Sequence, residues 1–579
     1  MELINRISKQ ITSLHEYVIY VVFTFVMLVK GGYYGYKYNP ILDDFIQYNA
    51  NTLYENPFKD VIIGTGLLNG RPLAGIFDLF FWSNFWDNMW LANLIIVLLH
   101  TASAILIYRL FARHFNTTPV FLFIYGLLPV GSEAVNWLSA SSRLVVPMFF
   151  LGIALNLIQA HFDTDKRNKK IYCCVLGMIC LFASMAFYEQ ITILAFVTAC
   201  ALLFINKRRL FDHLILFIPS VLIASFYLFM DTASIYSDRS NIINISALPS
   251  ELYQHGASAY SRILYALFPL NFETAQKGFI KGTDILSADA NIVFIILLVI
   301  AAAMVFFLML FHDKKQGKEQ PDEMPNVFIL IFSLILIFMP MLIFFLLQNP
   351  WVSMRNVFPS ILGFALFFDL IFRWLLYNKY VRSIVVTSLC VVFIIANVAE
   401  MHDYLAVGEI DKKIAQETVK VVMADKYKFE NDIPKDDKDD RNTADVKKDF
   451  DTVVILNTKD TYIDAALQYN EHINNITSSD WAYKGAIAST AKTTDVPQIY
   501  PLKEGLIEEL FPKLDTNDID ACYYMDEDFK LHRLTVVPYK ENYVFYDGDT
   551  VYAELVQWQN QDPTIIIAGN KEENVDDKK

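Results

Sequence analysis

Long apolar runs separated by short polar segments make up the first 400 residues of the chain. A helix needs about 20 mainly apolar residues to cross the hydrocarbon core of a bilayer. The pattern therefore predicts about eleven membrane-spanning helices, several of them short. We expect these helices at residues 14–31, 89–110, 117–131, 144–162, 171–188, 190–206, 211–230, 291–312, 326–347, 356–377 and 381–400.

Basic residues mark every second connection between these runs. Clusters of Lys and Arg follow the second, fourth, sixth and eighth runs and separate the tenth from the eleventh. Because basic loops are retained in the cytoplasm, the N-terminus is predicted to be cytoplasmic and the C-terminal region to lie outside. The first run has no small-residue cleavage site, so we interpret it as a retained span.

The character of the sequence changes at about residue 401. Residues 425–452 are rich in Lys and Asp, which is typical of a linker or a solvated face. Residues 452–457 predict a buried strand, residues 460–469 a following helix, and residues 534–538 and 564–568 further strands. We therefore expect three regions: a transmembrane domain (1–400), a charged linker or helical segment (401–450) and a small extracytoplasmic α/β domain (451–579).

The composition agrees with a multispanning membrane protein. The chain is 54% hydrophobic and only 19% charged, and its mean hydropathy is +0.33. The net charge of −14 argues against a nucleic-acid partner. The six cysteines form no CxxC pair and no zinc spacing. Together with the short loops, the lone Cys522 in the soluble part favours a bacterial plasma membrane.

Two adjacent carboxylates, Asp43 and Asp44, follow the first apolar run. Like charges held this close at the mouth of a membrane helix are costly, because each raises the energy of the other. A solvated loop pair is the alternative interpretation. The position at the end of a span favours a pair whose charge is used.

Further charged residues are predicted on the same outer face, in loops or at the ends of apolar runs. An arginine there holds a phosphate or carboxylate in two-point geometry, or anchors at the lipid headgroups. An acid in a turn as tight as the one between the fifth and sixth runs indicates a functional or network role. The residues are Arg71, Glu133, Arg143, Glu189, Arg262 and Arg355.

The order of short motifs along the chain is more specific than any one of them. The motifs are Asp43-Asp44 with Asn49, then Arg71-Pro72-Leu73, then Asn93 and His100, then Pro129 to Val135 followed by Arg143, then Ser184 and Glu189, and last Arg355 before Pro359-Ser360 and Gly363. This order resembles the membrane part of the GT-C glycosyltransferases. In particular, it resembles the protein O-mannosyltransferases and the transmembrane O-mannosyltransferases that target cadherins. It covers roughly residues 15–370.

The chain also departs from that family. Tyr188 stands where the family has a Lys before the Glu, and Leu144 stands where an acid often follows the Arg. The helical repeats of the cadherin-targeting enzymes are replaced by a different domain. The resemblance therefore supports a GT-C-like fold, with about eleven transmembrane helices and a C-terminal extracytoplasmic α/β domain, more strongly than it supports any acceptor.

The resemblance implies an enzyme that takes a sugar from a polyprenyl-phosphate donor on the outer leaflet. The phosphate needs a cation, for which Arg262 and Arg355 are the candidates and Arg71 and Arg143 the substitutes. The acceptor is a cell-envelope glycan, a lipid or a protein, and membrane lipid surrounds the enzyme. No sugar or acceptor is specified.

The proton of the acceptor hydroxyl needs a general base within about 3 Å. Asp43 or Asp44 is expected to be that base, because a neighbouring acid raises the pKa of one of the pair. A single displacement inverts the anomeric centre. Glu189 and Glu133 then position groups or bind a metal, so a divalent cation stays open and no cofactor is assigned.

Three other classes of protein compete with this interpretation. A polymerase or ligase of lipid-linked glycans would use outer arginines without the acid pair. A lipid or polysaccharide transporter would show internal repeats and charges at mid-membrane, and neither is evident. A scaffold would act through its exterior domain. Deletion of residues 401–579 is expected to inactivate a scaffold and to alter only acceptor choice in a transferase.

Overall fold

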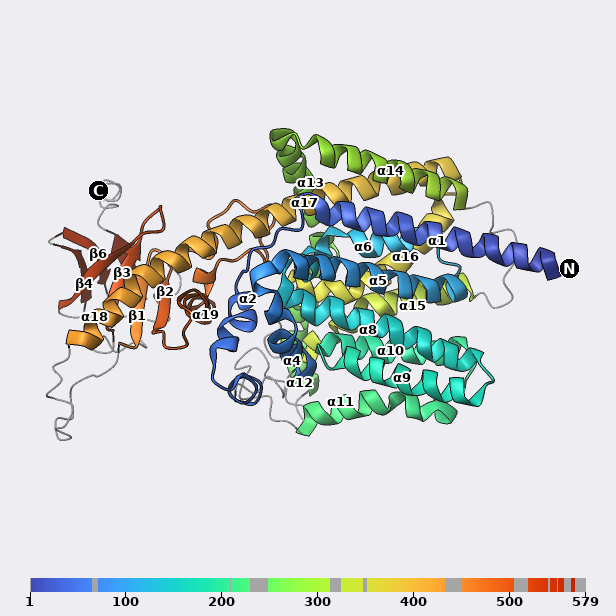
Figure 1. The fold of residues 1–579 in the computed structure, drawn as a ribbon, viewed down its shortest axis with the longest axis horizontal. Helices are drawn as coiled ribbons and strands as arrows, with labels where there is room; N and C mark the ends of the chain where they lie inside the picture. Colours follow the sequence, from blue (N-terminus) through green and yellow to red (C-terminus); the bar gives the residue numbers. More distant parts are fainter. Residues whose placement is uncertain are drawn as a thin grey trace. The chain divides into compact units, whose positions relative to one another are not determined.

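The computed structural model is mostly helical, with a β-sheet near the C-terminus (Figure 1). The described residues are 2–64, 71–208, 210–229, 248–312, 324–346, 351–432, 450–503, 519–539, 542–548, 550–556 and 564–567. The chain divides into two compact units. The membrane unit consists of Met1–Tyr38, Asn56–Leu405 and Ala465–His472, and the C-terminal unit of Asn39–Glu55, Ala406–Asp464 and Ile473–Lys579.

Helices form almost all of the membrane unit. They are α1 (Glu2–Gly32), α4 (Pro72–Phe80), α5 (Met89–Phe115), α6 (Val120–Leu127), α7 (Ser132–Asn136), α8 (Leu138–Asp163), α9 (Arg167–Met185), α10 (Glu189–Ile205), α11 (Ile218–Phe229), α12 (Leu248–Leu267), α13 (Pro269–Asp289), α14 (Ile292–His312), α15 (Asn326–Phe338), α16 (Ile361–Leu375) and the first part of α17 (Lys379–Thr418). A short 3-10 segment, η10 (Met354–Ser360), precedes α16.

Seven helices in the described part of the chain are long and apolar enough to cross a membrane. This architecture is that of a polytopic α-helical membrane protein. The seven are Pro72–Phe115, Leu138–Asp163, Arg167–Met185, Ile292–His312, Asn326–Phe345, Met354–Leu375 and Lys379–Phe429, and the shorter apolar helices are Glu189–Ile205 and His213–Ile223.

The segment expected to span at 117–131 has a different structure. Its helix, α6, has 8 residues, a length of about 12 Å at the usual rise per residue, which is too short to cross a bilayer core. All eight side chains of α6 are buried. The apolar side chains of this segment are enclosed by protein. An apolar run by itself does not distinguish a segment enclosed by protein from a membrane span.

Much of the chain between the expected spans 211–230 and 291–312 is helical. Residues 230–247 lie outside the described part of the chain, and α12 and α13 follow. Pro269 begins α13, where its fixed φ suits the first helical turn and its missing N–H costs nothing. The two helices are amphipathic and carry polar residues, so a search for long apolar runs does not detect them.

Close packing fixes α13 against α17. Gly278 and Gly282 lie one turn apart on α13, and a Cβ on Gly282 would lie 2.1 Å from the carbonyl oxygen of Ile395. Only glycine permits this approach of two backbones. The same packing brings Lys281 to within 2.6 Å of Asp403 on α17.

The C-terminal unit contains a sheet of seven strands in the order β2-β1-β3-β4-β5-β6-β7. The strands are β1 (Thr452–Leu456), β2 (Gln498–Leu502), β3 (Ala521–Met525), β4 (Leu531–Tyr539), β5 (Asn542–Asp547), β6 (Thr550–Val556) and β7 (Thr564–Ile567). β1 pairs in parallel with β2 and β3, with Val453 opposite Ile499 and Ala521. From β3 onward the pairing is antiparallel. The strands predicted at 452–457, 534–538 and 564–568 are confirmed.

The helices of the C-terminal unit are α2 (Asp43–Tyr48), α18 (Ala424–Asp432), α19 (Asp480–Ala491) and the last part of α17. The helix predicted at 460–469 is wrong, because this segment is irregular. Its polar groups bond to neighbours instead of to each other: the Asp460 carbonyl accepts from the Asn475 N–H, and Asn475 Oδ1 accepts from the Tyr462 N–H. The expected boundary at residue 400 lies inside the continuous helix α17.

Candidate functional site

A cleft with a volume of ≈ 530 Å³ is present in the membrane unit. Its size falls in the range of small-molecule sites in proteins. One arginine, three aromatic rings and two small polar side chains contribute to its wall. The lining residues are Ser261, Arg262, Tyr265, Trp351, Val352, Tyr469 and Asn470.

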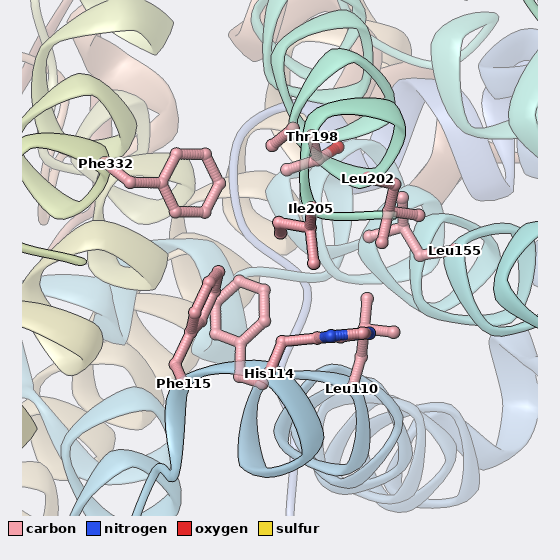
Figure 2. A pocket seen from close by; sticks show the side chains of 10 residues that line it. Leu110, His114, Phe115, Leu155, Thr198, Leu202, Ile205 and Phe332 are labelled. Carbon is pink, nitrogen blue, oxygen red and sulfur yellow. The ribbon is translucent and has the colours of Figure 1, made fainter. Parts of the chain in front are cut away.

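A second cavity of the membrane unit is much smaller, with a volume of ≈ 10 Å³ (Figure 2). It lies among side chains of α5, α8, α10 and α15, most of them apolar, including Leu110, Leu155, Leu202 and Phe332. This volume holds about one water molecule. We interpret it as a gap in helix packing and not as a ligand site.

Three chain segments meet at the cleft. α12 supplies Arg262 and Tyr265, and the extended residues before η10 supply Trp351 and Val352. The third segment supplies Tyr469 and Asn470. It contacts the second segment, because the Asn470 side-chain amide donates to the Val352 carbonyl. The rings of Tyr265 and Tyr469 are 5.6 Å apart between centroids. Segments distant in sequence therefore form one wall.

Arg355 in η10 connects two acids. Its backbone N–H donates to Glu133 Oε2 at 2.9 Å, and its Nη1 is 3.4 Å from Glu133 Oε1. Its Nη2 is 2.6 Å from Glu471 Oε2. The guanidinium also stacks 4.7 Å over the Trp137 ring. Burial of Glu133 raises the pKa of this carboxyl, and Arg355 partly offsets that effect.

His472 lies in the same buried network. Its Nε2 is 2.9 Å from Glu400 Oε2, and its Nδ1 is 3.1 Å from the Tyr404 hydroxyl and 3.8 Å from Glu133 Oε2. Ser132 donates a further hydrogen bond to Glu400 at 3.2 Å. Burial lowers the pKa of His472, but the attraction of Glu400 and Glu133 outweighs it, so that the pKa is raised overall.

Glu133 and Arg355, both predicted as site residues, are thus in contact, although 222 residues separate them. Arg71 and Glu189 form a second predicted pair: Arg71 Nε is 3.2 Å from Glu189 Oε1. The Arg71 guanidinium also lies 4.5 Å from the centre of the Tyr188 ring. Tyr188 therefore provides an aromatic face for the arginine.

Arg143 has a purely internal environment. Its Nη2 is 2.8 Å from Asp78 Oδ2, and its Nη1 donates to the Ser139 carbonyl at 2.7 Å. The two charged side chains are 9% and 3% exposed. Ser142 adds a hydrogen bond to Asp78 at 3.1 Å. The pair neutralises itself within the membrane unit, which argues for a structural role of Arg143.

The acid pair belongs to the C-terminal unit, at the start of α2. Asp44 is fully buried, and its Oδ2 accepts the Ile41 N–H at 3.1 Å. Asp43 is partly exposed. The two adjacent acids therefore differ: Asp44 fixes the local backbone, and Asp43 is the more accessible carboxylate.

The residues Glu400, Asp403, Glu471 and His472 were not predicted. Glu400 is the final residue of the last expected span, 381–400, and a charge at that position is a signal that the sequence offers. Glu471 and His472 lie beyond the membrane domain expected from hydropathy, so no local signal connects them to it. His100, one of the motif residues, packs between the rings of Tyr125 and Phe358 at 5.4 Å from each.

Within the described residues, no three His, Cys, Asp or Glu side chains are grouped so that they could hold a metal ion. The cleft and the network beside it contain arginines, aromatic rings and buried acids. Comparisons of the chain with protein-family models, with curated proteins and with solved structures gave no match. The fold defines the class, a polytopic helical membrane protein with a C-terminal α/β unit.

Proposed function

We propose that this protein is a membrane glycosyltransferase. It would transfer a sugar from a polyprenyl-phosphate donor to a glycan, lipid or protein acceptor on the extracytoplasmic side. The observation that carries the proposal is the ≈ 530 Å³ cleft, in which Arg262 lies with Tyr265, Trp351 and Tyr469. A guanidinium suits the phosphate, and aromatic faces suit the apolar faces of a sugar ring.

The choice of Arg262 for the phosphate rests on where each arginine lies. Arg143, Arg71 and Arg355 are not among the residues that line the cleft. Arg262 is an exposed side chain that lines the cleft itself. A phosphate would find in Arg262 a cation at the cleft surface, with the Asn470 amide and the Tyr265 hydroxyl as polar groups for sugar hydroxyls.

The lipid tail of such a donor needs an apolar surface beside the protein. α14 presents Ile292, Val293, Ile296 and Val299, each more than half exposed. A large exposed apolar helix face is typical of contact with lipid. The membrane unit therefore supports a donor that is delivered by a polyprenyl chain.

For the general base we propose Asp43, because it is the more accessible of the two acids. The acceptor hydroxyl oxygen would bond to the anomeric carbon while the bond from that carbon to the phosphate oxygen breaks. The polyprenyl phosphate leaves with the electron pair, and Asp43 takes the hydroxyl proton. This single displacement inverts the anomeric centre. Asp43 and the cleft belong to different units, and each is tested separately.

The first experiment is mass analysis of envelope glycans, glycolipids and glycoproteins from cells with and without the gene. A sugar lost without the gene and restored by the wild-type chain identifies the product. Asp43→Asn should then lower the transfer rate by about 10²- to 10⁴-fold, the usual contribution of a general base. Asp44→Asn serves as the neighbouring control. Identical glycans with and without the gene would end the proposal.

A further inference from the structure

The chain inserts eight residues from its C-terminal part into the membrane unit. Ala465–His472 belongs to the membrane unit, although the residues on both sides of it belong to the C-terminal unit. We call these residues the inserted segment. Its Tyr469 and Asn470 line the cleft, so part of the cleft wall comes from a region that hydropathy assigns to a separate soluble domain.

The inserted segment is attached at both ends. Near its beginning, the Ala466 N–H donates to Asp403 Oδ2 at 2.8 Å, and Asp403 is paired with Lys281 at 2.6 Å. Near its end, Glu471 is paired with Arg355, and His472 is in contact with Glu400. These contacts hold Tyr469 and Asn470 between two anchored ends.

The charges around His472 favour its imidazolium form. Arg355 is paired with two carboxylates, those of Glu133 and Glu471, while Glu400 is in contact with His472. Glu133, Glu400 and His472 are all almost completely buried. A neutral residue in place of His472 would leave a buried carboxylate without a cation, which is costly in a low-dielectric interior.

Groups from two elements face the imidazole. α17 contributes Glu400 through Oε2, Tyr404 through its hydroxyl, and the charge of Asp403, while α7 contributes Glu133. Beyond these groups, Lys281 and His402 contact Asp403, and Arg355 contacts Glu133. Among the described residues, the groups in these contacts with the ring are acids and a phenol.

We propose that His472 is a positioning residue: as an imidazolium between Glu400 and Glu133 it holds the inserted segment against the membrane unit, and the attached segment completes the donor cleft. The statement that the segment completes the donor cleft rests on the proposed function, because it takes the cleft as the donor site. The chemical class of the ligand is a prenyl phosphate.

The attachment should depend on pH in one direction. Because the pKa of His472 is raised in the folded protein, the imidazolium stabilises the attached state fully below the ordinary histidine pKa of about 6.5. That stabilisation is lost as the pH rises through the raised pKa. The inserted segment should therefore be held most tightly below pH about 6.5 and loosen as the pH rises above that value.

Hydrogen exchange of the full-length chain tests the attachment without any ligand. In His472→Gln the amides of residues 465–472 should exchange at least about tenfold faster than in the wild type at equal pH, since a hydrogen bond to a charged group is lost. Gln468→Ala is the matched control, because Gln468 is an exposed residue of the same segment. It should leave exchange unchanged.

The pH dependence of exchange and a second variant test the same attachment. After correction for intrinsic exchange, the wild-type segment should lose protection as the pH rises above the ordinary histidine pKa of about 6.5 and through the raised pKa of His472, and His472→Gln should show no such change. If His472→Gln does not fold, Tyr404→Phe removes only the hydroxyl that faces Nδ1, and a smaller increase in exchange is expected. Wild-type protection of the segment in these variants, independent of pH, would overturn the role of His472.

Binding of farnesyl phosphate tests the link to the cleft. The wild type should bind this probe, and His472→Gln and Asn470→Ala should raise its Kd by about tenfold or more, while Gln468→Ala leaves the Kd unchanged. If Arg262→Ala weakens binding and the two segment variants do not, the segment does not complete the cleft. If the wild type does not bind the probe, the proposed function and the donor role of the segment both fail, and exchange alone decides the attachment.

Discussion

Arg143 and Arg262 lie in the same membrane unit. From the sequence, Arg262 was expected to bind the phosphate and Arg143 was its substitute. In the structure, Arg143 is enclosed in α8 and bonds to Asp78 and Ser139. Arg262 is exposed on α12 and lines the ≈ 530 Å³ cleft. The same side chain thus neutralises a buried acid in one place and faces a ligand-sized space in the other.

The difference shows that residue type predicts a chemical capacity, while burial and partners determine how it is used. A buried guanidinium has its hydrogen-bond donors committed to fixed protein acceptors. A guanidinium at a cleft surface can exchange its present contacts for those of a phosphate at lower cost. Arg355 is intermediate, because it is 21% exposed and joins two acids next to the cleft wall.

Arg143→Ala should show the largest effect on stability. It leaves the carboxylate of Asp78 buried without its cation, which costs about 3–5 kcal/mol. The measurement is thermal or denaturant unfolding of the purified protein in detergent. The double variant Arg143→Met with Asp78→Leu removes both charges and should lose much less stability than Arg143→Ala. If Arg143→Ala were as stable as the wild type, the contrast with Arg262 would not hold.

Arg262→Ala should affect ligand binding more than stability, because the contacts of an exposed arginine contribute little to folding. Loss of a charge-assisted bond to phosphate costs about 1.5–3 kcal/mol, which corresponds to an increase of about 10- to 150-fold in the Kd of farnesyl phosphate. Arg262→Lys keeps the charge without the two-point geometry, so its Kd should lie between those of the wild type and Arg262→Ala. A large drop in unfolding temperature with an unchanged Kd would reverse the assignment.

Arg71→Ala should show the smallest effect on stability. The Arg71 and Glu189 side chains are 22% and 28% exposed, and pairs that solvent can reach contribute about 0–1 kcal/mol. Unfolding temperature and transfer activity, measured on the same preparation, separate the two roles. Loss of activity at wild-type stability would place Arg71 with Arg262, and an effect on stability alone would place it with Arg143.

The structure also changes how a deletion is interpreted. Removal of residues 401–579 was expected to alter only acceptor choice in a transferase. That deletion also removes Tyr469 and Asn470 from the cleft wall and His472 from the buried network. A transferase and a scaffold would therefore both lose function, and the point variants of the inserted segment are the better test.

Much of the membrane unit could be predicted because its signals are local. The runs expected at 89–110, 144–162 and 291–312 correspond to α5, α8 and α14. Each contains enough consecutive apolar residues to define itself. α12 and α13 do not, because their polar residues conceal them from a hydropathy search, and α6 is apolar only because protein encloses it.

The candidate site could be predicted only in part. Glu133 and Arg355 were both identified as outer-face residues, but their contact spans 222 positions and has no local signature. The helix expected at 460–469 is replaced by tertiary hydrogen bonds such as that between Asp460 and Asn475. Helix propensity was outweighed in this segment by hydrogen bonds to residues outside it.

The sequence by itself determined that the protein is polytopic and helical and that a strand-forming region follows, because hydropathy and strand patterns act over 5 to 20 neighbouring residues. Only the tertiary structure decided which charges meet. It paired Arg143 with Asp78, joined Arg355 to Glu133 and Glu471, and brought Tyr469 to the side of Arg262. The physical reason is that an ion pair or a cleft depends on distance in space, which the order of residues does not specify.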